Sequence, residues 1–470
     1  MLKTEIEENN FLFLEVGNSL PLSIVKKLAT ECEIKNIYGT VSDRSIDISI
    51  FSEPPLYVWD LFDGKYPSVL PIDREYENPI SEYTVEILHQ MARHGNLNFE
   101  KRTCLYYTHL KYWDDFLEKK KINYVVFSML PHETYNFIIY LLCKKKKIKT
   151  CMSYIDGYKL SITPKAYYML NFLEEHTIEV KEKYEDLRMR YQDKNENEIN
   201  IPDCMEDIVK KIIARFDKAE TTHMTLMNEM RLKDIKRYYS DPQGTFQRVR
   251  QGQDSLRSLA GSYRQYLRGR YRTKKLIKKY EGVATQPDYS DKYVFYALHY
   301  QPECTSSPLG GGFSNQLLAI QLIAYNLPEG YWLYVKEHPV QSAFGREPSY
   351  YEELIIIPKV KVISQKNTSE KLMKHAMAVA TLTGTVIYES QLIQKPCLCL
   401  GYSPLELLDG VYRINTNEEC QRAITEIIAG KAKVTQAKDF KLFLQAMEET
   451  CFAKADEDEY YQKILKFVNT

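Results

Sequence analysis

The chain has 470 residues, which is enough for two or three packed domains. Its 63 Lys and Arg residues balance 63 Asp and Glu residues, and this neutrality argues against a dedicated nucleic-acid-binding protein. Hydrophobic residues make up 44% of the chain and charged residues 27%, which are ordinary globular values and exclude wholesale disorder.

The sequence offers no secretory or membrane-spanning signal. The first ten residues, MLKTEIEENN, lack the cationic start and apolar stretch of a signal peptide. The apolar run FIIYLLC at 137–143 is far shorter than the ~20 residues that cross a bilayer. None of the ten cysteines forms a CxxC motif, and Cys397 and Cys399 are expected to be buried thiols on one face of a strand. We therefore expect a cytoplasmic protein.

Residues 1–165 alternate short apolar runs with helical periodicity, which predicts parallel strands joined by helices. We place strands at 11–16, 46–51, 124–129 and 149–155, and a helix over LSIVKKLA after Pro21.

Residues 166–285 read as a helical, highly charged insertion. Within it, residues 231–281 hold 15 Lys or Arg against four acidic residues, and arginines alternate with tyrosines in YRQYLRGRYR. Three interpretations stay open: a solvated helical face, contact with an anionic membrane surface, and stacking on RNA bases.

Strand–helix alternation resumes over 286–435 and predicts a second doubly wound domain. Helical residues 436–470 are expected to pack back on the first domain. The predicted fold class is thus α/β, with two Rossmann-type domains facing a cleft and a helical basic insertion. The strands of the second domain are expected at YVFYALHY (293–300), YWLYVKEH (331–338), VKVIS (360–364), AVATLTG (378–384) and PCLCLG (396–401).

Ligands of doubly wound sheets bind outside the carboxyl ends of the strands. In the second domain these ends carry the Gly310–Gly312 loop, the run Lys336-Glu337-His338-Pro339 and the run Thr383-Gly384-Thr385. Each is also compatible with a purely structural role, since a TGT sequence forms ordinary tight turns. Together they predict a phosphate site, with Glu389 one helical turn further on and able to accept from ribose hydroxyls.

The order YALHYQPE, GGGF, LYVKEHP and LTGTVIYESQLIQKPCLCLG resembles the donor-binding half of the capsule polysaccharide biosynthesis glycosyltransferases. That family includes transferases of the sugar acid Kdo and is distantly similar to sialyltransferases with a His-Pro motif. The resemblance covers residues 293–401, and more weakly VVFSMLPHETYNFIIYLLCKKKKIK in the first domain. It implies a GT-B fold, a CMP-linked ulosonic acid donor, a glycan or lipid-linked glycan acceptor, and no catalytic metal or further cofactor.

The resemblance implies a role for specific residues. The nucleotide-sugar-binding candidates are Gly311, Gly312, Lys336, His338, Pro339, Thr383, Gly384, Thr385 and Glu389. A base must deprotonate the acceptor hydroxyl, and the strand ends of the first domain offer His132, Glu133 and Asp156. Asp156-Gly157 matches part of an acidic-acidic-Gly motif of the sialyltransferases, although Ile155 replaces the first acid. Each carboxylate is also compatible with a cap or turn role.

Two other functions remain compatible with the sequence. A nucleotide-sugar epimerase would use the same phosphate site without a separate acceptor. A non-catalytic protein would bind anionic lipid or RNA through residues 231–281. The expected location is the cytoplasm, with the basic segment at the inner face of the membrane and no nucleic acid as a partner.

Overall fold

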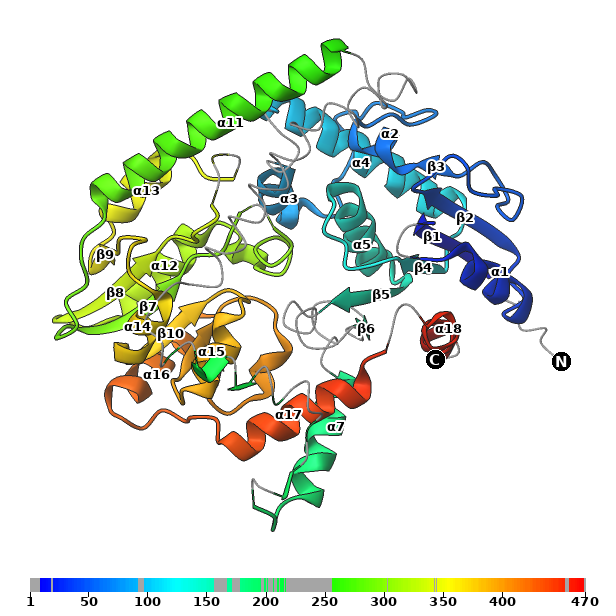
Figure 1. Cartoon of the computed structure of the whole chain (residues 1–470). Helices are drawn as coiled ribbons and strands as arrows, with labels where there is room; N and C mark the ends of the chain where they lie inside the picture. Colours follow the sequence, from blue (N-terminus) through cyan, green and yellow to red (C-terminus); the bar gives the residue numbers. More distant parts are fainter. Residues whose placement is uncertain are drawn as a thin grey trace. The chain divides into compact units, whose positions relative to one another are not determined.

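A computed structural model describes residues 9–17, 20–91, 97–155, 167–170, 178–195, 256–301, 303–341, 345–452 and 456–468, with single residues between 198 and 216 and residue 343 (Figure 1). The chain divides into two compact units. The first unit comprises Met1–Ile208 and Ala437–Thr470, and the second comprises Val209–Gln436.

The first unit is built on a six-stranded sheet in the order β3-β2-β1-β4-β5-β6. All neighbouring strands are parallel except β6, which pairs antiparallel with β5 at the edge. The order reverses between β1 and β4, which is the position where doubly wound sheets bind ligands. The strands are β1 (Asn10–Val16), β2 (Asn36–Val41), β3 (Leu56–Tyr57), β4 (Tyr124–Phe127), β5 (Lys149–Ile155) and β6 (Tyr167–Leu170).

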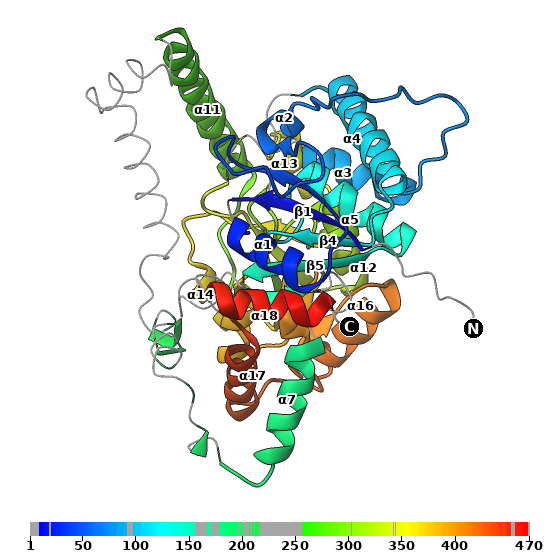
Figure 2. The ribbon, with the colours of Figure 1, turned by 90° about the vertical axis from the view of Figure 1, so that its right-hand side faces the viewer.

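Helices from both ends of the chain complete the first unit. They are α1 (Leu22–Glu31), α2 (Val58–Phe62), α3 (Thr84–Gln90), α4 (Phe99–Lys119), α5 (Thr134–Lys146), α7 (Ile178–Arg190), α17 (Ala437–Thr450) and α18 (Glu457–Val468). The C-terminal helix α18 lies beside α1, and α17 lies beside α7 (Figure 2). Phe452, Tyr460 and Ile464 are buried in the same apolar core as Phe11 of β1, so the C-terminal segment is part of this core.

The second unit repeats the topology. Its sheet has the order β12-β11-β10-β7-β8-β9, all parallel, and reverses between β7 and β10. The strands are β7 (Lys292–Ala297), β8 (Tyr331–Lys336), β9 (Val360–Val362), β10 (Ala378–Thr381), β11 (Cys397–Cys399) and β12 (Val411–Arg413). The helices are α11 (Leu256–Val283), α12 (Gln316–Asn326), α13 (Ser349–Ile355), α14 (Ser369–His375), α15 (Val386–Leu392) and α16 (Asn417–Ile428).

The two doubly wound units confirm the predicted α/β fold class with two Rossmann-type domains. Cys397 and Cys399 are buried free thiols in β11, as expected. Within the described residues, no helix has both the length and the apolar character needed to cross a membrane.

The strand predicted at 46–51 is wrong, because these residues form turns and β2 lies earlier in the chain. The Asp47 carboxylate accepts the Ser49 backbone N–H at 3.0 Å, a local hydrogen bond that competes with strand pairing. The apolar pattern of 46–51 has another cause. Ile46 and Phe51 pack so closely against Gly17 and Gly39 that an added Cβ at either glycine would overlap them.

Candidate functional site

The switch point of the second sheet lies between the ends of β7 and β10, and a buried histidine joins the two. His299 follows β7, and its Nε2 accepts the backbone N–H of Thr383 at 3.1 Å and lies 2.9 Å from the hydroxyl of Thr381. With Nε2 as an acceptor, the ring proton is on Nδ1. Burial, the neighbouring His338 and Arg346 lower the pKa of His299 to about 3, so the ring is neutral at physiological pH.

Gly384 completes this contact because it has no side chain. A Cβ at this position would lie 3.0 Å from Cε1 and 3.1 Å from Nε2 of His299. That spacing is shorter than an ordinary contact between carbon atoms, so the ring would have to move away from Thr383. The backbone of Thr383–Gly384 and the imidazole therefore form one rigid group at the sheet edge.

His338 lies just past β8 in a turn that fixes both its backbone and its ring. Its carbonyl accepts the Gln341 backbone N–H at 3.0 Å and the Gln365 Nε2 at 3.1 Å. The Val340 backbone N–H donates to His338 Nδ1 at 3.4 Å, which leaves the proton of the neutral ring on Nε2. His338 is half-buried, and its ring lies 5.9 Å from that of Tyr300.

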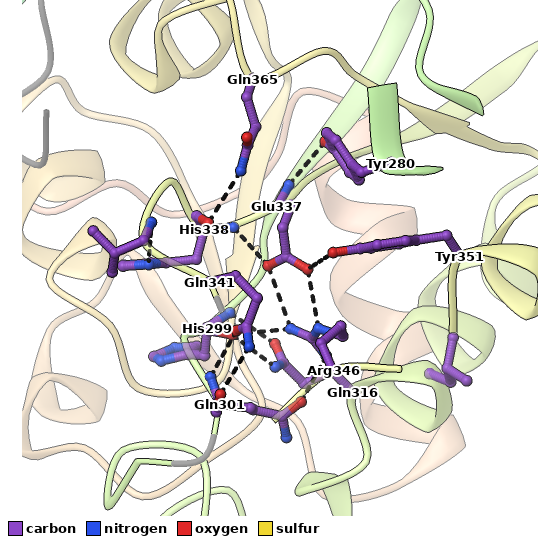
Figure 3. Close-up of polar contacts among 12 residues, drawn as sticks. Tyr280, His299, Gln301, Gln316, Glu337, His338, Gln341, Arg346, Tyr351 and Gln365 are labelled. Atoms are coloured by element: carbon purple, nitrogen blue, oxygen red, sulfur yellow. Dashed lines mark hydrogen bonds and ion pairs between the residues drawn. The ribbon is translucent and has the colours of Figure 1, made fainter. Parts of the chain in front are cut away.

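A buried ion pair between Arg346 and Glu337 stabilises this turn (Figure 3). Arg346 Nε donates to Glu337 Oε2 at 3.0 Å, and the two side chains are only 1% and 2% exposed. The same carboxylate accepts the Tyr351 hydroxyl at 2.8 Å and the His338 backbone N–H at 2.7 Å. Burial disfavours the charge of Arg346, but Glu337 holds its pKa above the ordinary value. Arg346 thus stays charged, and Glu337 connects it to the backbone of His338.

Arg346 also ties the ends of β7 and β8 together. Its Nη1 donates to Gln301 Oε1 at 2.6 Å, and its Nη2 donates to the carbonyl of His299 at 3.1 Å. Gln316 at the start of α12 holds His299 from the other side, accepting its N–H at 2.9 Å. The side chains of this network converge on Glu337 and on the backbone of His299, just past the ends of β8 and β7 (Figure 3).

Lys336 is the last residue of β8 and is almost fully buried. Its Nζ donates to the Ser369 hydroxyl at 3.0 Å. Burial lowers its pKa to about 8, although the nearby Glu370 favours its charged form. Glu370 Oε2 is itself buried without a hydrogen-bond partner.

The other predicted residues of the second unit lie around the same edge. Gly310 packs its backbone against Ser306 and Leu382, where a Cβ would lie 2.4 Å from the Ser306 carbonyl. Gly311 adopts a left-handed conformation with φ of 51°, and Gly312 is exposed. Thr385 is exposed at the start of α15, and Glu389 is half-buried one turn further on.

In the first unit, His132 and Glu133 lie together at the start of α5. His132 Nδ1 lies 2.9 Å from the Leu130 carbonyl oxygen, and its Nε2 lies 3.4 Å from Glu133 Oε1. Glu133 is the N-cap residue of α5 but makes no side-chain capping hydrogen bond. Asp156 lies outside the described residues. Within the described residues, no group of three or more His, Cys, Asp or Glu side chains is placed to hold a metal ion.

The sequence reasoning missed His299 and Arg346. The signal for His299 is present in the sequence, because it stands at the end of the predicted strand YVFYALHY, and ligands of such sheets bind at strand ends. Arg346 lies in a loop, and no sequence pattern shows that it pairs with Glu337.

Most of the second unit is similar to a known protein family. Residues 304–444 match the family model described as capsule polysaccharide biosynthesis protein. No curated protein matches the chain significantly.

Similar solved structures share low sequence identity with the chain. UDP-GlcNAc 2-epimerase from Methanocaldococcus jannaschii is 13% identical, with 94% of this chain and 99% of that chain covered and a TM-score of 0.29. The beta Kdo 2,7 transferase KpsC from Thermosulfurimonas dismutans is 11% identical, with 83% and 97% covered and a TM-score of 0.29. The beta Kdo 2,4 transferase KpsC of the same organism is 16% identical, with 37% and 53% covered and a TM-score of 0.24.

The family match contains the His338 turn, the glycine loop and the Thr383–Thr385 segment, which carried the resemblance in the sequence. Residues 304–444 of this chain are therefore similar to the family of capsule polysaccharide biosynthesis proteins.

Proposed function

We propose that the chain is a glycosyltransferase of bacterial capsule or lipopolysaccharide synthesis. In this proposal it transfers an ulosonic acid, such as Kdo or a sialic-acid-like sugar, from a CMP-linked donor to a glycan acceptor. The observation that supports it is the pair of histidines, His299 and His338, that follow the neighbouring strands β7 and β8 at the carboxyl edge of the second sheet. The family match covers His338 and most of the residues around it.

The chemistry of the transfer explains why such a pair is useful. Breaking the bond between the anomeric carbon and the phosphate leaves negative charge on the departing CMP. Fixed N–H donors stabilise that charge without reorganising during the reaction. His338 carries a proton on Nε2, and the hydrogen bonds around Glu337 hold its turn in place. Lys336, Pro339, Gly311, Gly312, Thr383, Gly384, Thr385 and Glu389 are proposed to complete the donor site.

The proposal makes the transferase independent of metal ions, because these donors take the place of a bound cation. Transfer should therefore continue in excess EDTA. Loss of turnover on chelation, restored by Mg²⁺ or Mn²⁺, would refute this part of the proposal.

Nucleotide binding provides the first test of the donor. A ligand that binds only the folded state at 100 times its Kd stabilises that state by ~2.7 kcal/mol, so thermal unfolding with CMP, CDP, UDP and GDP ranks the four. We expect the largest increase in melting temperature with CMP. A preference for UDP or GDP would refute the ulosonic acid donor, and isomerisation of a nucleotide sugar without acceptor would favour an epimerase.

The long helix α11 supports an anionic membrane surface as a partner. Among the side chains that the structure describes, one exposed face carries cations at helical spacing, with the exposed side chains of Leu267 and Tyr271 between them. The cations are Arg264, Arg268, Lys274, Lys275 and Lys278. Each Lys or Arg near an anionic membrane contributes about 1 kcal/mol, and the two apolar side chains suit the interface between headgroups and acyl chains. A lipid-linked acceptor would be presented at this surface.

A further inference from the structure

A buried carboxylate occupies the switch point of the first sheet. Glu15 is the second-to-last residue of β1 and lies within the otherwise apolar run FLFLEV. Its side chain is buried, although a carboxylate loses much of its hydration there. Among the described residues it forms no ion pair with Lys, Arg or His, so hydrogen bonds alone compensate this loss.

The backbone of β1 is distorted at this residue. Pairing of β1 with β2 runs in register up to Phe13 opposite Gly39, and it resumes with Val16 opposite Val41, so the two residues between them face the single residue Thr40. Glu15 has a φ of 60°, a left-handed conformation that costs a residue with a side chain about 1–3 kcal/mol. Its backbone N–H donates to Thr40 Oγ1 at 2.8 Å. A bulge of this kind redirects a side chain.

Three donors fix the carboxylate in this direction. Ser128, just past β4, donates its hydroxyl to Glu15 Oε2 at 2.9 Å. Tyr135 and Asn136, in the first turn of α5, donate to Glu15 Oε1 at 2.8 and 2.7 Å. A carboxylate has about four acceptor positions, so one position on Oε2 remains for a further donor.

Several buried oxygen atoms around the start of α5, which holds Glu15, have no hydrogen-bond donor. Asn136 Oδ1, on the amide that holds Glu15, is buried without a partner, and so is Thr134 Oγ1 in the same turn. Gln90 binds the carbonyl of His132 through its Nε2 at 2.7 Å, while its Oε1 is buried and unpaired. Such unpaired oxygens suit a ligand that brings O–H donors, as a sugar does.

We propose that Glu15 is the catalytic base that deprotonates the acceptor hydroxyl, an inference that rests on the transferase function proposed above. The acceptor oxygen forms a bond to the anomeric carbon of the donor as the bond from that carbon to the phosphate oxygen breaks. The electron pair of the broken bond leaves with CMP, and the hydroxyl proton passes to Glu15 Oε2.

This assignment differs from the candidates that the sequence provided. Glu133 has no capping bond and lies against His132, with a side chain 19% exposed. Glu15 is held by groups from β4 and α5, so its carboxylate needs no reorganisation before it accepts a proton.

The decisive variant is Glu15→Gln, which keeps the shape of the side chain but cannot accept the proton. We expect transfer to fall by ~10²–10⁴-fold, the usual contribution of a general base, with the melting temperature and the stabilisation by CMP unchanged. Glu33→Gln is the matched control, because Glu33 lies in the same unit, also has a left-handed backbone (φ of 48°) and is exposed. It should transfer at the wild-type rate.

Three results separate the possibilities. Transfer by Glu15→Gln within about threefold of the wild type overturns the proposal. Loss of transfer in Glu133→Gln but not in Glu15→Gln assigns the base to Glu133 instead. Failure of the wild type to bind CMP or to transfer sugar counts against the proposed function, whatever Glu15 does.

A second variant decides the matter if Glu15→Gln folds poorly. Asn136→Ala removes one donor to the carboxylate and leaves Ser128 and Tyr135 in place. Losing a hydrogen bond to the ionised form favours protonation, so the acidic limb of the kcat/KM profile should move to higher pH. Tyr135, His132 and Glu133 are the other titratable groups at this end of α5. Burial, followed by Glu15, raises the pKa of Tyr135 well above its ordinary value, so Tyr135 does not titrate in that range. An unmoved profile overturns the proposal.

Discussion

Replacing Arg346 by methionine should destabilise the second unit strongly. The variant removes the contact of Arg346 Nε with Glu337 at 3.0 Å and that of Nη1 with Gln301 at 2.6 Å. It leaves a carboxylate that is 2% exposed without its cation. Removing one partner of a buried ion pair costs about 3–5 kcal/mol, because the remaining charge is neither solvated nor paired.

A second substitution separates the unpaired charge from lost packing. Adding Glu337→Gln to Arg346→Met removes the stranded charge, so the double variant should recover about 1–2 kcal/mol relative to Arg346→Met. The matched control is Lys279→Met, which breaks the 2.6 Å pair between Lys279 and Glu352 on the surface of the same unit. Both partners are at least 40% exposed, so this change should cost less than ~1 kcal/mol.

Unfolding in urea, followed by ¹⁹F NMR of fluorotryptophan, isolates the relevant unit. Trp332 in β8 is the only one of the three tryptophans in the second unit. Its resonance therefore reports this unit even if the two units unfold separately. The reasoning is refuted if Arg346→Met costs no more than Lys279→Met, or if the double variant is no more stable than Arg346→Met alone.

The remaining predictions concern the donor histidines and α11. His338→Ala should melt within a few degrees of the wild type but should no longer be stabilised by CMP. Its rate of transfer should fall by ~10²–10³-fold, as when a fixed hydrogen-bond donor is removed. A strongly destabilised variant that still binds CMP would show that the histidine is structural. Because the pKa of His299 is about 3 in the folded protein and 6.5 ordinarily, the unfolded chain holds more protons between these values. Stability should therefore fall as the pH drops below about 6.5, by up to ~1.4 kcal/mol per pH unit, and urea unfolding of His299→Gln should lack this part of the slope. In flotation assays the full chain should bind vesicles of phosphatidylcholine with phosphatidylglycerol, but not phosphatidylcholine alone, and should dissociate in high salt. Vesicle binding should be lost when four cations of α11 are changed to Gln, namely Arg268, Lys274, Lys275 and Lys278. It should be retained when four exposed lysines elsewhere are changed instead, namely Lys101, Lys121, Lys147 and Lys431. Equal effects of the two sets, or RNA binding without vesicle binding, would contradict the membrane proposal.

Most of the fold could be predicted because parallel sheets impose a strong pattern. β1, β4, β8 and β10 are largely apolar runs, and such runs followed by helices indicate doubly wound sheets. β2 was missed because its sequence, NIYGTV, contains a glycine and looks weak as a strand. Its stability comes from pairing with β1 and from Phe51, which packs over Gly39. Packing between distant segments overrides local propensity here, and periodicity does not reveal it.

In the candidate site, too, some residues are indicated by the local sequence and others only by packing between distant segments. His338 and Thr383–Thr385 could be found because each follows a strand, and strand ends define the ligand edge of the sheet. The partners that hold them are not periodic. Arg346 reaches Glu337 from a loop, and the orientation of Glu15 depends on a bulge that forms only against Thr40 of β2. These groups are recognised only once distant segments are placed together.

The last two turns of α11 make this part of the helix belong to the core of the second unit. Leu276 and Tyr280 are buried in the core of that unit. The Tyr280 hydroxyl accepts the backbone N–H of Glu337 at 3.0 Å and donates to the carbonyl of Ile363, so it joins the ends of β8 and β9. A fragment that begins at residue 286 would lose this bridge and open the core beneath His338. A form of the second unit that folds on its own should therefore begin before Leu276, and it then includes Lys278 of the basic face.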